Sequence, residues 1–473
     1  MKLFKTTKTE NTRERLVINE LTKALGSKKV LTNIEDRICY SFDGTRQKAL
    51  PNVIVRPYNT SDVSSAIKVA DKYEAPVCPR GAGTGLSGGA VPIHGGILFD
   101  LRKMDKIISI CPEDFIATVE PGVITKHFQD EVAKYGLFYP PDPSSADFST
   151  IGGNVAECAG GITGLKYGVT RDYVLALEIV LPDGSIINTG RKTLRSVAGY
   201  DLTRLFVGSE GTLGIFTRIT LKLIPRPAKI DTLAAFFSER DDAIDAADSI
   251  MNNNILPRTL EFIDHMCINA VRGYEGVTID EGVKALLLID IDGNVDSIRH
   301  ELYVVENVCN ENNALSVSVA ETAKERDSLW AVRRVISPAL FNIASSKINE
   351  DICVPRSKIK EILIKIDQIN KEDPIYIANF GHIGDGNIHV NMMYKDESGQ
   401  EEIAERKVNQ IMEEVIKLGG TISGEHGIGN KKSQFMKLEI PPQEFAIMKR
   451  LKNLFDPKGI MNPGKMFPAD CDV

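Results

Sequence analysis

The clearest pattern of apolar and polar positions in the first half of the chain is a strand, a helix and a second strand between residues 53 and 79. Residues 53–55 are three consecutive apolar residues, which predicts a short buried strand. Thr60 or Ser61 can cap the following helix, whose apolar residues recur at helical spacing. Residues 76–79 then return as a second strand. Because one helix connects the two strands, we expect them to be parallel.

Predicted strands dominate the chain from there to residue 223. They cover residues 97–101, 107–110, 117–120, 173–181, 185–189 and 215–223, with one predicted helix over residues 125–135. An Asp-Gly pair at 183–184 joins two of these strands as a hairpin. Pro225 and Pro227 end the pattern, so we expect a first domain over residues 51–227, preceded by a helical lead-in over residues 1–50.

The second half of the chain mixes helical and strand periods. Strands are predicted at residues 230–237, 284–291 and 317–320, and helices at residues 241–252 and 296–311. An antiparallel sheet with helices on one face is the simplest arrangement of these elements, so the fold class is predicted to be α+β. We expect this second domain to span residues 228–420, with residues 421–473 as a separate C-terminal segment.

A glycine-rich loop follows the predicted strand at 76–79 and reads PRGAGTGLSGGA from Pro79 to Ala90. Its glycines match the G-x-G-x-x-G dinucleotide pattern, but Pro92 prevents the helix that this pattern requires. The Gly-Lys-Ser/Thr of a P-loop is absent from this sequence too. The remaining functional interpretation is a loop whose backbone N–H groups wrap a pyrophosphate, with Arg80 supplying positive charge. A purely structural glycine turn is the alternative.

Two further glycine-rich segments occur before residue 215. Residues 149–169 are rich in Gly, Ala and Thr, so they leave little side chain to pack and allow another molecule to approach the backbone closely. The segment 139–146, which contains consecutive prolines, would hold this stretch in place. Residues 208–214 form a third glycine loop.

Two of the seven histidines flank a turn in the stretch GHIGDGNIHVN, residues 381–391. Its glycines exclude a helix, so His382 and His389 must converge across a tight turn, and the polar side chains after the turn share one face that we expect to border a pocket. Glu425 and His426 lie on another glycine-rich turn. Two imidazoles and a carboxylate are a plausible ligand set for Zn²⁺, Fe²⁺ or Mn²⁺. Ordinary hydrogen-bonded turn histidines are the alternative.

Charge and cysteine usage exclude several classes of protein. The net charge is −7, with no dense run of Lys or Arg, which argues against a nucleic-acid partner. The polar N-terminus and the lack of a long apolar run in this sequence predict a cytoplasmic protein, with peripheral membrane association left open. Eight cysteines are scattered without a C-x-x-C pair, so we expect no iron–sulfur cluster on this chain.

The glycine-rich motifs, taken in order, resemble one family of flavoenzymes. They read PRGAGTGLSGG, PPDPSS, TIGGNVAECAGG and GSEGTLGI. In this order and spacing the chain is similar to the FAD-binding proteins of the vanillyl-alcohol-oxidase/p-cresol-methylhydroxylase (PCMH) type, in the branch of D-lactate dehydrogenases, glycolate oxidase catalytic subunits and D-2-hydroxyglutarate dehydrogenases. The resemblance covers about residues 50–465. It implies a two-subdomain FAD-binding domain, a substrate (cap) domain with an antiparallel sheet and helices, and a C-terminal segment returning to the flavin.

The resemblance also implies which residues hold FAD. They are Arg80, Gly81, Ala82, Gly83, Thr84, Gly85, Leu86, Ser87, Gly88, Pro141, Asp142, Ser145, Gly152, Gly153, Asn154, Glu157, Gly160, Gly161, Gly164, Tyr167, Gly168, Glu210, Gly211, Gly214, Ile215 and Asn462, with Lys465 returning beside Asn462. Members that bind flavin covalently often present a histidine in the first loop. Thr84 and Gly85 stand there in this chain, so we expect non-covalent FAD.

For the substrate, the resemblance implies that Arg333 grips a carboxylate, as a planar guanidinium suits. Family members acting on dicarboxylates usually carry a lysine where Asn349 stands, which favours a monocarboxylate. A metal held by His382, His389 and Glu425 would lower the pKa of the substrate hydroxyl, with His426 as general base. The Cα hydride would then pass to flavin N5.

The predicted activity is oxidation of a small D-2-hydroxy acid, D-lactate or glycolate, to the 2-oxo acid. Electrons would leave for an electron-transferring flavoprotein, an iron–sulfur subunit or a quinone, and the chain could be the lactate dehydrogenase subunit of an electron-transferring-flavoprotein complex. D-2-hydroxyglutarate dehydrogenase is an alternative. Two alternatives come from other functional classes. A metallohydrolase would use the histidine motifs but not the glycine loops, and a non-catalytic flavin-binding subunit would use the glycine loops but not the histidine motifs.

Overall fold

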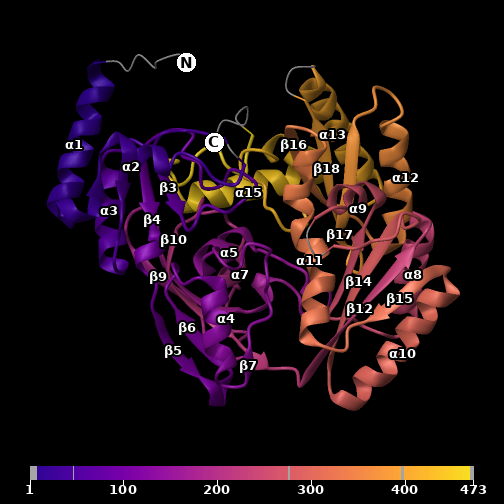
Figure 1. The fold of residues 1–473 in the computed structure, drawn as a ribbon. Helices are drawn as coiled ribbons and strands as arrows, with labels where there is room; N and C mark the ends of the chain where they lie inside the picture. The colour runs from indigo at the N-terminus through magenta and orange to yellow at the C-terminus, as the bar shows by residue number, and fades with distance from the viewer. Residues whose placement is uncertain (1–7, 46, 275–276, 396–398, 469–473) are drawn as a thin grey trace. The chain divides into compact units, whose positions relative to one another are not determined.

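A computed structural model describes residues 8–45, 47–274, 277–395 and 399–468 (Figure 1). The chain divides into two compact units. Unit 1 comprises Met1–Ala159, Val169–Arg226 and Glu425–Val473, and unit 2 comprises Gly160–Gly168 and Pro227–Gly424. Each unit is therefore assembled from segments that are far apart in the sequence. None of the described helices is long and apolar enough to cross a membrane.

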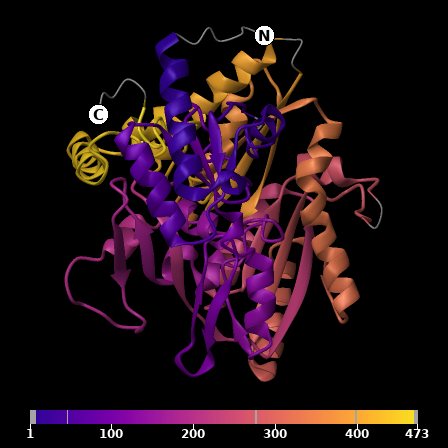
Figure 2. The ribbon, with the colours of Figure 1, turned by 90° about the vertical axis from the view of Figure 1, so that its left-hand side faces the viewer.

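The first sheet of unit 1 contains the predicted strand–helix–strand motif. Its strand order is β1 (Val30–Leu31), β2 (Val53–Val55), β4 (Ile97–Asp100), β3 (Val77–Arg80). β2 and β3 are both parallel to β4, which lies between them, so the predicted parallel orientation is confirmed. Helices α1 (Lys8–Leu25) and α3 (Thr60–Lys72) lie side by side, as the two indigo helices in Figure 2 show. The side chain of Asn59 caps α3 by accepting a hydrogen bond from Asp62 N.

The second sheet of unit 1 has five antiparallel strands. Their order is β5 (Ile107–Cys111), β6 (Ile116–Val119), β10 (Ile215–Lys222), β8 (Val174–Val180), β9 (Ile186–Gly190). β8 and β9 pair directly, which confirms the predicted Asp-Gly hairpin. Phe128, Tyr139 and Phe206 are fully buried in the core of this sheet. The other elements of this unit are α2 (Ile34–Cys39), α4 (Thr125–Ala133), β7 (Leu137–Phe138), α5 (Ile151–Glu157), α7 (Leu202–Phe206), β11 (Ile224–Pro225), α14 (Met436–Glu439) and α15 (Pro442–Phe455).

The C-terminal segment joins unit 1 through β3. Val77 N donates to Ile460 O at 2.8 Å, and Asn462 N donates to Val77 O at 2.7 Å. Ile460 and Met461 are buried in the core of the first sheet. The chain therefore returns to the strand that precedes the first glycine loop.

Unit 2 is built on one seven-stranded sheet, and every strand pair in it is antiparallel, as predicted. The strand order is β15 (Ala314–Val319), β12 (Lys229–Phe237), β14 (Ala285–Gly293), β13 (Thr259–Ile263), β17 (Tyr376–His382), β18 (Asn387–Tyr394), β16 (Ser346–Cys353). Directly paired residues share a side of a sheet. Ala234, Leu288, Glu261 and His382 form one such row across β12, β14, β13 and β17. We call the side that bears them face A and the opposite side face B.

Helices cover both faces of this sheet, so the prediction of helices on one face was wrong. On face A, residues of α9 (His265–Val271) and α11 (Ala323–Ala339) share a buried cluster with Ala234 and Leu288. On face B, α8 (Arg240–Asn252), α10 (Val295–Glu311), α12 (Ile359–Ile369) and α13 (Gln400–Lys417) form a connected layer (Figure 1). The physical reason is visible in β14, where the residues of both faces are buried, because a strand covered on both sides needs a continuous apolar run.

Candidate active site

The hairpin of β17 and β18 carries the two predicted histidines. His382 ends β17 and pairs with Asn387 at the start of β18, which confirms the tight turn. Gly386 has φ +93°, and a Cβ there would lie 1.9 Å from the carbonyl oxygen of Val354, so glycine is required at this position. Both imidazoles are buried on face A, with ring centroids 5.4 Å apart.

Glu261 on β13 is a central residue of this cluster, and sequence reasoning missed it. Its carboxylate hydrogen bonds to Nδ1 of His382 and accepts a 2.7 Å hydrogen bond from Nε of Arg333. Burial would raise the pKa of Glu261, but His382 and Arg333 outweigh burial and lower the pKa to about 2. A single carboxylate in the apolar strand TLEFI was the available signal, because a buried charge requires a partner.

Arg333 lies on α11 and reaches face A of the sheet. Its guanidinium stacks on Phe380, 4.4 Å from the ring centroid, while Nε binds Glu261. Its Nη1 and Nη2 atoms make no hydrogen bond to the residues that the structure describes. The guanidinium is thus fixed at Nε and by stacking, and its two terminal nitrogens can receive a carboxylate.

His389 pairs in register with a second carboxylate that sequence reasoning missed, Asp351 on β16. Asp351 is fully buried, and its Oδ1 lies 3.7 Å from Nδ1 of His389. Asn387 Nδ2 donates to Asp351 Oδ1 at 2.6 Å, and Ser423 Oγ donates to Oδ2 at 3.2 Å. Like Glu261, Asp351 is an acidic residue within a strand. A charge that a strand buries requires a partner, so the acid itself was the available signal in the sequence.

The chain passes from unit 2 to unit 1 at Gly424 and Glu425. A Cβ on Gly424 would lie 2.1 Å from Asn387 Nδ2 and 3.3 Å from Asp351 Oδ1, so the backbone passes directly over these two side chains. One trans peptide bond keeps the Cα atoms of Gly424 and Glu425 about 3.8 Å apart. Glu425 therefore directly follows Gly424, whose backbone lies over Asn387 and Asp351.

The donor atoms in both units suit a divalent metal. In unit 2, Asp351 and His389 offer ligand atoms within 4.8 Å of each other. In unit 1, the ligand atoms of Glu425 and His426 meet the same limit, with His426 Nε2 3.8 Å from Glu425 Oε1. Imidazole and carboxylate donors of this kind are those that Zn²⁺, Fe²⁺ and Mn²⁺ prefer.

Glu210 holds the turn that follows His426. Its two carboxylate oxygens accept hydrogen bonds from Ile428 N at 2.7 Å and Gly429 N at 2.6 Å. Burial raises the pKa of Glu210, although these N–H groups oppose the rise. Asn462 Nδ2 donates to the backbone carbonyls of Glu210 and Gly89. The carboxylate of Glu210, predicted to bind cofactor, thus contacts the backbone after His426.

The first glycine loop and α5 lie against each other in unit 1. A Cβ on Gly81 would lie 2.3 Å from Thr150 Oγ1, and Thr150 caps α5 by accepting from Gly153 N at 3.2 Å. This helix contains the predicted residues Gly152 to Glu157 and was not anticipated, because its glycines disfavour a helix. The side chain of Arg80 lies beneath the loop, where a Cβ on Gly83 would overlap it.

This part of unit 1 fits a cofactor with a pyrophosphate. Lys465 is 3% exposed, and its Nζ has no hydrogen-bond partner among the described residues. Ser209 Oγ is likewise buried without one. Buried polar groups are nearly always satisfied, so these atoms indicate a ligand that completes them. Burial lowers the pKa of Lys465, although Glu210 and other neighbours oppose the shift.

The remaining predicted cofactor residues fall in three places. Pro141, Asp142 and Ser145 lie in the loop after β7, and Gly211, Gly214 and Ile215 lead into β10. Gly160 to Gly168, including α6 (Gly164–Tyr167), belong to unit 2. There Asp292 accepts hydrogen bonds from Lys166 Nζ at 2.6 Å and Tyr167 Oη at 2.7 Å. α6 is thus tied to β14 at the edge of face A.

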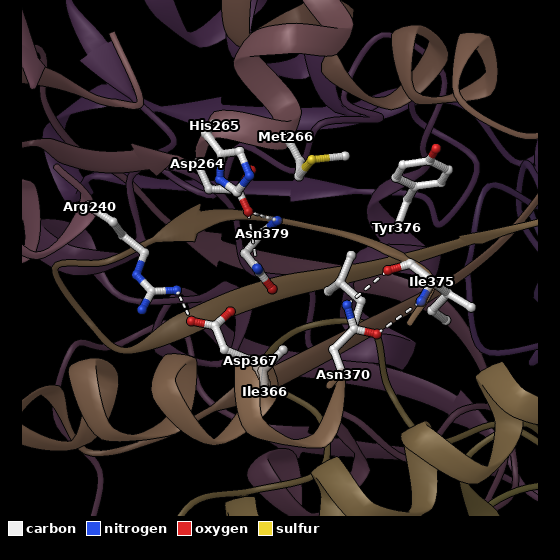
Figure 3. A pocket seen from close by; sticks show the side chains of 11 residues that line it. Arg240, Asp264, His265, Met266, Ile366, Asp367, Asn370, Ile375, Tyr376 and Asn379 are labelled. Carbon is white, nitrogen blue, oxygen red and sulfur yellow. Dashed lines mark hydrogen bonds and ion pairs between the residues drawn. The ribbon is translucent and has the colours of Figure 1, made fainter. Parts of the chain in front are cut away.

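Face B carries a separate cavity of about 160 Å³ (Figure 3). Asn379 of β17 points into it, and Asp264 accepts hydrogen bonds from both Asn379 N and Nδ2. At the opposite wall, Arg240 Nη1 donates to Asp367 at 2.8 Å. Because neighbouring strand residues point to opposite faces, this cavity lies behind Phe380 and is distinct from the histidine cluster.

Comparison with known proteins identifies the fold and the relatives. Residues 51–190 match the FAD binding domain model, and residues 226–466 match the model of the C-terminal domain of FAD linked oxidases. The chain is 43% identical to the glycolate oxidase subunit GlcD of Bacillus subtilis, over 92% of this chain and 93% of that protein. It is 36% identical to D-lactate dehydrogenase of Anaerostipes hadrus, over 94% and 96%.

Solved structures agree on the fold. Substrate-bound p-cresol methylhydroxylase superposes with a TM-score of 0.80 at 17% identity and covers 99% of both chains. 4-Ethylphenol oxidase from Gulosibacter chungangensis has a TM-score of 0.77 at 19% identity, over 97% and 98%. These matches confirm the predicted α+β fold of the vanillyl-alcohol-oxidase/PCMH type. Because both family models match and the relatives align along more than nine tenths of the chain, this protein belongs to the FAD-linked oxidases and is a flavin-dependent oxidoreductase.

Proposed function

We propose that this protein is a FAD- and metal-dependent dehydrogenase that oxidises a small D-2-hydroxy acid, D-lactate or glycolate, to the 2-oxo acid. The observation that carries the proposal is the chain of contacts Arg333–Glu261–His382 on face A. It provides a carboxylate-binding guanidinium next to an imidazole suited to metal ligation. Relatives named glycolate oxidase subunit and D-lactate dehydrogenase support the same substrate class.

Arg333 would orient the substrate by its carboxylate. Its Nε is occupied by Glu261 and its plane is stacked on Phe380, so the terminal nitrogens present a fork in one orientation. A bidentate contact places the adjacent Cα and its hydroxyl in a defined position. Family members that act on dicarboxylates usually carry a lysine at the position of Asn349. The neutral amide of Asn349 lacks the positive charge that would bind a second carboxylate, which supports a monocarboxylate substrate.

His382, His389 and Glu425 would hold the metal, with Asp351 supporting His389. The ionised carboxylate of Glu261 accepts the Nδ1 proton of His382, which leaves Nε2 as the ligand atom. A divalent ion bound there would lower the pKa of the substrate hydroxyl. His382 and His389 belong to unit 2, and Glu425 is the residue at which the chain re-enters unit 1.

His426 would accept the hydroxyl proton. Glu210 fixes the backbone two and three residues beyond His426, so the imidazole is carried on a turn whose position is set by a buried carboxylate. General-base catalysis requires this kind of positioning within hydrogen-bond reach of the proton. The segments around Arg80 and α5 would hold FAD, which would supply the acceptor for the Cα hydride.

Anaerobic titration of the purified holoenzyme tests the proposal. D-lactate, L-lactate, glycolate and D-2-hydroxyglutarate would each be added while flavin bleaching is followed. We expect D-lactate or glycolate to bleach the flavin at the lowest concentration, because a single guanidinium fork serves a single carboxylate. Stronger bleaching by D-2-hydroxyglutarate would reassign the substrate, and no bleaching by any of the four would refute the proposed activity.

Electrons then leave the reduced enzyme for a separate acceptor. We propose an electron-transferring flavoprotein, an iron–sulfur subunit or a quinone, because the sequence has no C-x-x-C pair to hold a cluster of its own. Reoxidation of the substrate-reduced enzyme by each class of acceptor, measured by return of the oxidised flavin spectrum, distinguishes among them.

A further inference from the structure

The loop between β9 and α7 has an exposure unlike that of the segments around it. Residues 191–202 are all exposed, while β9 before them and α7 after them contribute buried residues to unit 1. The magenta trace at the left edge of Figure 2 shows a long loop projecting from the strands. It lies between the two segments that match the family models, which end at residue 190 and begin at residue 226.

Three large apolar side chains between residues 194 and 200 of this loop are in contact with water. Leu194 is 61% exposed, Tyr200 is 96% exposed and Val197 is 100% exposed. Isolated exposed apolar residues are common on soluble proteins, but three within seven residues on a projecting loop are not accounted for by core packing. Together they form an apolar tip that another surface can cover.

Cations accompany the apolar tip. The guanidinium of Arg191 donates to the backbone carbonyl of Gly190, and neither Lys192 nor Arg195 forms an ion pair with any residue that the structure describes. This positive charge is local, because the whole chain has a net charge of −7. The loop has three cations and one acid, Asp201, which forms an ion pair with Arg204 of α7. It is therefore a basic and apolar element on an acidic protein.

We propose that the loop 191–202 is a docking element for an anionic lipid surface. Val197 and Leu194 would enter the acyl boundary, and Tyr200 would occupy the headgroup level, where tyrosine is favoured at bilayer interfaces. Arg191, Lys192 and Arg195 would contact anionic headgroups, with their aliphatic stems beside the apolar residues. A lipid surface fits better than a protein groove because the loop projects outward and a bilayer needs no matching concave shape.

The docking element complements the proposed function and rests on its electron-acceptor part. A quinone resides in the bilayer, so a dehydrogenase that reduces a quinone must approach the membrane. Loop 191–202 contains none of the residues assigned to substrate, metal or flavin. Substitutions there change docking and leave substrate-driven flavin reduction intact.

Co-sedimentation of the full-length holoenzyme with quinone-free vesicles tests the proposal. The vesicles contain phosphatidylcholine with 30 mol% phosphatidylglycerol in one arm and phosphatidylcholine alone in the other. We expect saturable binding to the anionic vesicles, binding at least tenfold weaker to the neutral ones, and release at 0.5 M NaCl, since salt screens exposed charges. Absence of binding to anionic vesicles overturns the proposal.

Two loop variants separate the apolar and the charged contributions. Leu194→Ser/Val197→Ser/Tyr200→Ser and Lys192→Glu/Arg195→Glu should each weaken vesicle binding at least tenfold. The matched control Arg299→Glu/Tyr303→Ser removes an exposed cation and an exposed aromatic from α10 and should bind like the wild type. Equal binding of wild type and both loop variants overturns the proposal.

Two further measurements identify other outcomes. If sedimentation velocity without vesicles shows a wild-type dimer that the loop variants dissociate, the loop is covered by a second copy and the lipid assignment is wrong. Anaerobic flavin reduction by D-lactate or glycolate is measured on the same preparations. Failure of that reaction refutes the proposed function, whereas failure of vesicle binding with normal flavin reduction refutes the docking element alone.

Discussion

Nε of Arg333 donates a 2.7 Å hydrogen bond to Glu261 Oε2, and the other oxygen of the same carboxylate binds Nδ1 of His382. One buried acid therefore orients both the proposed carboxylate-binding group and a proposed metal ligand. Arg333 and Glu261 are separated by 72 residues in sequence, and His382 and Glu261 by 121. The pairing of β13 with β17 brings Glu261 and His382 together, and α11 carries Arg333 to the same carboxylate.

Replacement of this acid should affect substrate and metal binding together. In Glu261→Gln the neutral amide cannot compensate the charge of Arg333, and its single oxygen cannot accept from both Arg333 and His382 as the carboxylate does. We expect KM for the hydroxy acid to rise about tenfold or more and metal affinity to fall about 10- to 100-fold, the usual effect of losing such a supporting residue. Steady-state kinetics and metal content after dialysis measure both. The control Glu239→Gln changes an exposed glutamate and should leave both unchanged. An effect on KM with normal metal affinity would contradict the shared role.

The same carboxylate should make stability depend on acid pH. The pKa of folded Glu261 is about 2, below its ordinary value of 4.5. Its contribution is therefore complete above pH 4.5 and is lost as the pH falls toward 2, and it amounts to on the order of 3 kcal/mol. Urea unfolding of wild type and Glu261→Gln between pH 6 and pH 3 should show a difference in unfolding free energy that shrinks with acidification. A difference independent of pH would exclude this origin.

Arg333→Lys retains the charge but removes the planar fork and the stacking on Phe380. We expect kcat/KM for the hydroxy acid to fall about 100-fold, corresponding to about 2.7 kcal/mol of lost transition-state stabilisation. The neighbouring Arg334→Lys is the control, because the side chain of Arg334 hydrogen bonds, among the described residues, to the backbone carbonyl of Asp327 and should tolerate lysine. Similar losses in both variants would indicate a general disturbance of α11.

His426→Ala should slow substrate-driven flavin reduction by about 100- to 10,000-fold, the range of general-base catalysis. FAD content should be unchanged, because the residues assigned to the flavin remain. Anaerobic stopped-flow absorbance measures the rate, and His300→Ala on the exposed side of α10 is the control. A rate in His426→Ala near that of the wild type would remove His426 from the base role.

Two glycine substitutions separate the cost of backbone strain from that of steric overlap. Gly386 lies in the β17–β18 hairpin, and Gly419 follows α13. Gly386→Ala would place its Cβ 1.9 Å from Val354 O at φ +93°, whereas Gly419→Ala meets nothing within 4 Å at φ +77°. Alanine in a left-handed conformation costs about 1 kcal/mol, so we expect that loss in Gly419→Ala and a clearly larger one in Gly386→Ala. Urea unfolding measures both. Equal losses would mean that the backbone at Val354 moves away at little cost.

The sequence predicted the parts of the fold whose signals are local. The hairpin at Gly386 and the antiparallel β8–β9 pair follow from turn residues and alternation, and both are confirmed. Glu261 and Asp351 were not predicted, because the partner of each acid is defined by its strand's register with another strand. Helix α5 was not predicted, because the low helix propensity of its glycines is outweighed by the cap at Thr150 and by the packing of Gly81 against Thr150.

The register of the β17–β18 hairpin also limits how such a site can diversify. Inserting or deleting one residue between His382 and Asn387 would turn every following side chain of β18 to the other face, exchanging His389 for Ile388 or Val390. Length changes that are harmless in most surface turns would therefore abolish the ligand set in one step. We therefore expect the hairpin to keep a constant length while substrate preference changes by point replacement elsewhere, with Asn349 as one proposed position.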